Sequence, residues 1–105
     1  MATFEHVGIA SVSDVETQFF SSTSDSTIIL SVLTTNITPG VTDVTCTHVD
    51  AGNNVVNRVA YNVTLPANSS LELLGNKYTL PSGHKFLIDT AVSGAMSVGA
   101  SFVVV

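Results

Sequence analysis

Three histidines are the side chains in this sequence best suited to metal binding or proton transfer. His6, His48 and His84 show no H-x-H or H-x-x-x-H spacing that would place two ligands on one element. A metal site would have to assemble in three dimensions, or on a three-fold axis with one histidine from each chain. The simpler interpretation is hydrogen-bonded strand histidines near the surface, so we expect no metal and no cofactor.

Other catalytic patterns are equally weak. Asp14 and Glu16 are the one close pair of acids, and they lie beside a predicted loop, where a solvated edge is expected. Cys46 lies in an alternating segment, which predicts a small inward-facing side chain rather than a reactive thiol. No serine stands in a G-x-S-x-G turn, and no glycine-rich loop precedes a helix. The sequence therefore predicts no enzymatic activity.

The charge balance disfavours two classes of partner. The net charge is −5, with only three Lys and Arg residues among 105. Nucleic-acid phosphates and anionic membranes both attract clustered cations, which this sequence lacks. The longest apolar run is 102–105, far shorter than a bilayer span. The first residues show no basic or apolar signal region, so we expect the protein to be made and assembled in a cytoplasm.

The low charge content favours association. Only 10% of the residues are charged, and charge is what keeps protein surfaces apart. We therefore expect other subunits to cover part of the surface. The alternative is a monomer covered by hydroxyl groups, since Ser and Thr supply 13 residues each.

The elements that must position these side chains are predicted to be short strands. Val occurs 16 times and Thr 13 times, and β-branched residues suit a pleated sheet. Turn signals recur roughly every 8 to 12 residues, and no segment has the period of a long helix. We predict strands over 3–12, 15–20, 27–33, 41–49, 55–65, 71–74, 77–80, 84–90 and from 96 onward. Between the last two, Ser93-Gly94-Ala95 is predicted to form a hairpin connection.

These patterns predict an all-β fold with one domain over 1–105. Without helical crossovers the strands must pair mostly antiparallel. We expect a two-sheet sandwich of about eight strands, Ig-like or jelly-roll, with a small closed barrel as the alternative.

Strand edges are the predicted contact surface. The usual protection of edges by lysine is nearly missing. We expect subunit contacts through the first and last strands, with Phe4, Val103, Val104 and Val105 as the contact residues. The alternative is that both strands simply pair inside their own sheet.

A second possible surface would bind a carbohydrate. Tyr61 and Tyr78 could stack on a sugar, with Asn53 and Asn54 as hydrogen-bonding groups. Against this, the chain has no Trp and only two Tyr.

Turn and strand segments along most of the chain resemble a family of virion proteins. The segments are Thr-Gln-Phe-Phe (17–20), Thr-Thr-Asn (34–36), Leu-Pro-Ala-Asn-Ser-Ser-Leu-Glu-Leu (65–73), Leu-Pro-Ser-Gly-His-Lys-Phe (80–86) and Ser-Gly-Ala (93–95). In them the chain resembles short virion structural proteins of tailed bacteriophages. The resemblance implies a β-sandwich in a symmetric array, most specifically a capsid decoration (cement) protein. Its implied partners are further copies of itself and the major capsid protein. A tail, neck or fibre accessory protein is the alternative, and no functional residue is carried over.

Overall fold

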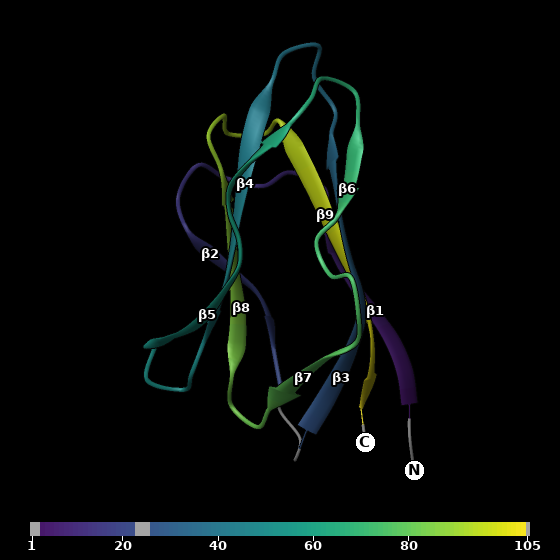
Figure 1. The fold of residues 1–105 in the computed structure, drawn as a ribbon, viewed down its shortest axis with the longest axis vertical. Helices are drawn as coiled ribbons and strands as arrows, with labels where there is room; N and C mark the ends of the chain where they lie inside the picture. Colours follow the sequence, from purple (N-terminus) through teal and green to yellow (C-terminus); the bar gives the residue numbers. More distant parts are fainter. Residues whose placement is uncertain (1–2, 23–25, 105) are drawn as a thin grey trace.

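The computed structural model describes residues 3–22 and 26–104, and its elements are all strands (Figure 1). They are β1 (Thr3–Ile9), β2 (Thr17–Ser21), β3 (Ser26–Asn36), β4 (Thr42–Val49), β5 (Val55–Leu65), β6 (Ser70–Glu72), β7 (Tyr78–Pro81), β8 (Lys85–Thr90) and β9 (Met96–Val104). The predicted all-β sandwich is confirmed, and β5 has the predicted bounds. β1 ends earlier than expected, at Ile9, and β3 continues further, to Asn36. Within the described ranges, no helix is long and apolar enough to cross a membrane.

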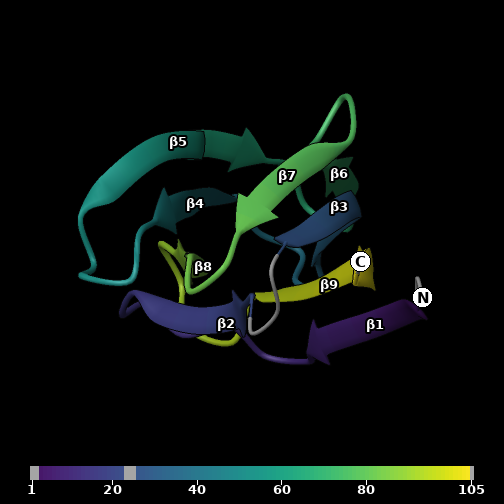
Figure 2. The same cartoon turned by 90° about the horizontal axis from the view of Figure 1, so that it is seen from below.

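The strands form two antiparallel sheets that pack face to face (Figure 2). One sheet has the order β1-β9-β3-β6, with β7 also paired to β3, and the other has the order β2-β8-β4-β5. The pairs run from the ends of the chain inward: β1 with β9, β2 with β8, β3 with β6 and β7, and β4 with β5. The chain is thus a long antiparallel hairpin wrapped into a sandwich by the β3–β9 and β4–β8 pairs. This arrangement is a jelly roll, which decides between the two sandwich types left open by the sequence.

The predicted hairpin at Ser93-Gly94-Ala95 is wrong. The strands that it joins, β8 and β9, belong to different sheets, so the connection crosses from one layer to the other. A local turn does form there, because Ala95 N donates to Val92 O and Gly94 has a φ of 80°. Gly94 N also donates to Val12 O at 2.8 Å, which ties the crossing to the segment after β1. The prediction of a turn at these residues is therefore correct, but the prediction that the turn joins two paired strands of one sheet is wrong.

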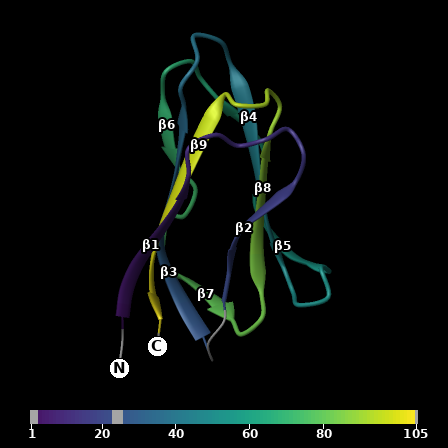
Figure 3. The ribbon, with the colours of Figure 1, turned by 180° about the vertical axis from the view of Figure 1, so that it is seen from behind.

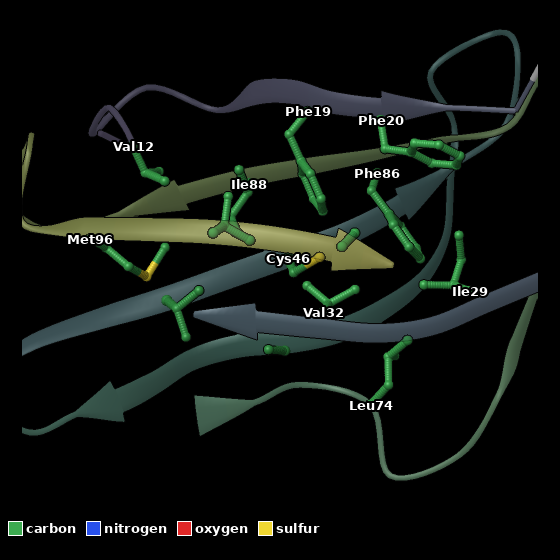
Figure 4. Packing of buried hydrophobic residues seen from close by; sticks show 14 of the residues in the cluster. Val12, Phe19, Phe20, Ile29, Val32, Cys46, Leu74, Phe86, Ile88 and Met96 are labelled. Carbon is green, nitrogen blue, oxygen red and sulfur yellow. The ribbon is translucent and has the colours of Figure 1, made fainter. Parts of the chain in front are cut away.

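The core lies between the two sheets and is built from alternating side chains (Figure 4). In β8, Phe86 and Ile88 are fully buried, and in β9 Met96 and Ala100 are fully buried. Cys46 faces the same interior, as predicted, and burial raises the pKa of its thiol to about 12, with a smaller contribution from the Asp89 carboxylate. A thiol with such a pKa is protonated at neutral pH and unreactive.

Glu72 bridges the break between β6 and β7. Its carboxylate accepts hydrogen bonds from Ser31 Oγ, from Val32 N at 2.8 Å and from Leu74 N at 3.1 Å. The Glu72 carboxylate thus takes the place of a backbone acceptor at the part of β3 that pairs with neither β6 nor β7. This explains why one jelly-roll strand appears as two short strands.

Asn36 holds the loops together at the end of the sandwich where β3 ends. Its side chain is fully buried, and its Nδ2 donates to the carbonyl oxygens of Gly40 at 2.8 Å, Leu65 at 3.1 Å and Pro66 at 3.2 Å. Its Oδ1 accepts from both the backbone N (3.0 Å) and the hydroxyl (2.7 Å) of Thr38. One amide therefore joins the 36–40 and 65–66 turns, which approach one another only in the folded chain.

Candidate subunit-contact surface

The two sheets have four edges, formed by β1, by β6 together with β7, by β2 and by β5, and these edges differ in how open they are. β5 has three register shifts against β4, and β2 has one against β8. β6 and β7 are short and separate. Bulges and short strands are the usual protection against edge pairing. β1 has neither, since its seven residues pair with β9 without a shift.

Two glycines lie opposite one another on the sheet face beside β1. Gly8 of β1 pairs with Gly99 of β9. The imidazole of His6 lies across this pair: a Cβ on Gly99 would stand 3.0 Å from His6 Nε2. His6 is thus an exposed surface histidine, as predicted, and its ring shields the glycine strip.

Apolar side chains continue this outer face. Phe4 is 76% exposed, and on β3 Leu30 and Leu33 are 36% and 46% exposed. Leu30 is the extra residue of a bulge between Ile29 and Ser31, which pushes its side chain off the sheet. A hollow of about 410 Å³ lies beside the edge and is lined by Phe4, Glu5, His6, Leu30, Ser101 and Phe102. Leu30 was not expected here, because a bulge shows no signal in a run of apolar residues.

The predicted contact residues fall into different environments. Phe4 lies on the open edge strand, which is visible at the side of the molecule in Figure 3. Val103 is only 9% exposed, and it pairs with Phe4 on one side and Ile28 on the other. Val104 is likewise paired on both sides and packs against the core. β9 is therefore an inner strand without a free edge, because β1 covers it. Val105 lies outside the described residues.

Two of the three histidines meet where β4 ends and β8 begins, although no short spacing in the sequence signals this contact. His48 Nε2 lies 2.8 Å from His84 Nδ1, and His48 Nδ1 lies 2.8 Å from Tyr78 Oη. Asn57 Nδ2 donates to the same Tyr78 oxygen at 3.1 Å. The tyrosine hydroxyl can then donate to His48, and neutral His48 can donate to His84. Among the described residues no third His, Cys, Asp or Glu joins them to form a metal-binding group.

The His48 cluster makes stability depend on pH. Burial, and then the charge of His84, lower the pKa of His48, against a smaller opposing effect of Asp50. Folded His48 therefore binds protons more weakly than it does in the unfolded chain. Its contribution to the free energy of unfolding is present above the ordinary histidine pKa of about 6.5 and is lost as the pH falls below that value. We expect the urea midpoint to fall between pH 7.5 and 5.5, and to fall less in His48→Gln. Parallel curves for the two proteins would contradict this assignment.

No hydrogen bond or ring contact joins Tyr61, Tyr78 and Asn53 to one another in the described part of the chain. Tyr61 is exposed, with the Arg58 guanidinium 5.1 Å from its ring centre. Tyr78 is half-buried within the histidine cluster. Asn53 Oδ1 accepts from Lys85 Nζ, and Asn54 donates to Asp50. Most of these side chains are thus held by internal contacts.

Jelly rolls of this strand order define a class of fold that includes viral capsid and lectin domains. No protein-family model matches the chain, and no curated protein matches it either. Among solved structures, it overlays on the T13 viral particle of infectious bursal disease virus with a TM-score of 0.51 and 14% identity, covering 97% of this chain and 30% of that one. For the VP2 subviral particle of the same virus, the TM-score is 0.52, the identity 15% and the coverages 97% and 32%. For the structure of the Gx strain of this virus, the TM-score is 0.52 and the identity 14%, and the match covers 97% of this chain and 31% of that one.

These likenesses show a shared fold. The chain spans about a third of the length of the viral chains it matches. They agree with the predicted β-sandwich, but the matched structures come from infectious bursal disease virus and not from a tailed bacteriophage, so the bacteriophage part of the resemblance gains no support.

Proposed function

We propose that this chain is a non-enzymatic structural subunit of a virion, and most specifically a decoration protein that binds a capsid shell. The observation that carries the proposal is the jelly-roll strand order of this chain, together with a likeness of fold to viral particle proteins that covers 97% of it. Its partners are then further copies of itself and the major capsid protein, and its location is the virion assembled in the host cytoplasm.

The outer face of the β1-β9-β3 sheet is the surface proposed to meet the shell. Phe4, Leu30 and Leu33 expose apolar area there, and Ser97, Gly99 and Ser101 lie between them on β9. An exposed apolar surface of this kind suits burial against another protein.

Particle composition tests this proposal. Particles from the source of the chain would be banded in a density gradient, treated with nuclease and protease, and quantified by mass spectrometry. We expect the chain at a fixed ratio of many copies per particle, with antibody label over the shell in electron micrographs. Label confined to a tail or fibre would overturn the decoration role in favour of an accessory role. Absence from the particles would overturn the virion role altogether.

A further inference from the structure

β1 offers a complete strand edge. Its seven residues pair with β9 through Val98–Val104, and within the described strands its other side pairs with nothing. The unpaired N–H and C=O groups of such an edge favour addition of another strand. The strand also contains no Lys, Arg or Pro, the residues that usually prevent this.

We infer that β1 pairs antiparallel with β1 of a second copy of this chain, across a two-fold axis at His6. The inference rests on the proposed structural role and specifies how two copies meet. His6 is the middle residue of Thr3–Ile9, so this register alone pairs the strand over its whole length. The five-stranded sheets that contain β1 in the two copies then form one continuous sheet through the dimer.

Side-chain placement supports the same register. In this register, Phe4 of each copy lies opposite Gly8 of the other, on the outer face of the sheet. An aromatic ring beside an edge glycine covers backbone that would otherwise be exposed. Phe4 is 76% exposed in the single chain, and a Cβ on Gly8 would lie 3.5 Å from its nearest neighbours, His6 Cε1 and Val98 O, which is an ordinary van der Waals distance. Glu5 lies opposite Val7, so the two acids are diagonal neighbours rather than directly opposed.

The charge distribution places little repulsion along β1. The chain has a net charge of −5, so broad contact between two copies would be repulsive. β1 carries only one acid, Glu5, and contact along this strand therefore brings few like charges together.

Cysteine cross-linking tests the register. In His6→Cys the two thiols would lie directly opposite one another, with Cα atoms about 4.5–5.5 Å apart, within disulfide reach. We expect an oxidised, covalent dimer on non-reducing gels. Phe4→Cys and Gly8→Cys should each stay uncross-linked, because the equivalent residues would be about 13 Å apart along the strand. An equimolar mixture of these two variants should cross-link.

Two controls are built into the chain. Native Cys46 is buried and should not react, and Tyr61→Cys places an exposed thiol on the bulged β5 edge. Failure of His6→Cys to cross-link, or equal cross-linking by Tyr61→Cys, would overturn the inference.

Sedimentation velocity gives an independent measurement. His6→Lys places two like charges directly opposite, and the dissociation constant of the dimer should rise about five- to tenfold. Circular dichroism checks that the fold is retained, which is expected because His6 is exposed. An unchanged dissociation constant, or a wild-type chain that stays monomeric, overturns the β1 pairing. A chain found in particles but monomeric overturns this inference alone, whereas a cross-linked dimer absent from particles overturns only the virion role.

Discussion

Replacing Phe86 with alanine is expected to lower the free energy of unfolding by about 3–5 kcal/mol, the usual cost of emptying a buried aromatic site. The side chain is 0% exposed and lies between the two sheets (Figure 4). Its ring centre is 5.9 Å from Phe19 and 5.6 Å from Tyr78, and it meets the edge of His48 at 6.0 Å. The substitution therefore leaves a cavity and also removes the support of the histidine cluster. Urea unfolding at pH 7.5 measures the loss.

The matched control is Tyr61→Ala on the surface of β5. Tyr61 is 62% exposed, and its ring contacts the Arg58 guanidinium. Loss of such a contact costs at most about 1 kcal/mol. A similar loss in both variants would mean that Phe86 does not anchor the core. Since small domains are stable by only about 5–15 kcal/mol, the alanine variant at Phe86 could lose much of its native population.

Replacing Asn36 with aspartate is expected to cost about 3 kcal/mol, because a buried donor becomes a charged acceptor. The new carboxylate oxygen would face the carbonyl oxygens of Gly40, Leu65 and Pro66, to which Nδ2 now donates. Thr38 would still donate to the other oxygen. The change in volume is negligible, so the loss reports the hydrogen bonds rather than packing. The unfolding midpoint in urea provides the measurement.

Asn76→Asp makes the same chemical change on the exposed turn before β7 and should alter stability by less than about 0.5 kcal/mol. The pH dependence gives a second check on Asn36→Asp. A protonated carboxyl can donate again, so the difference from the wild-type protein should shrink as the pH falls towards 4. A difference that is small at neutral pH, or that grows in acid, would show that the amide does not hold the two turns.

Much of the local structure follows from the sequence alone. In β9, Met96, Val98 and Ala100 alternate with Ser97 and Gly99, and a period of two is a property of neighbouring residues. β5 occupies the residues between two turns, and Cys46 faces inward, as the alternation of apolar and polar residue types over 43–47 predicts. The all-β class and the antiparallel sandwich follow in turn from the absence of helical periodicity.

The tertiary structure decided which strands are neighbours and, with that, where the candidate site lies. Ser93-Gly94-Ala95 favours a turn whether the next strand stays in the same sheet or crosses to the other. Pairing with β1 and β3 is what places β9 in the opposite sheet from β8. The same pairing encloses Val103 and leaves Phe4 on a free edge. The joining of His48 to His84 and of Asn36 to the 65–66 turn is likewise non-local, because the partners are 36 and 29 positions apart.

The sequence by itself thus determined the strands, their inward faces and the low charge that favours association. The jelly-roll order, the open edge of β1 and the hydrogen-bonded clusters were decided only by the folded chain. The physical reason is that alternation and turn preference are set by neighbouring residues. Strand partners, in contrast, are chosen by burying two whole sheets against one another, to which every strand contributes.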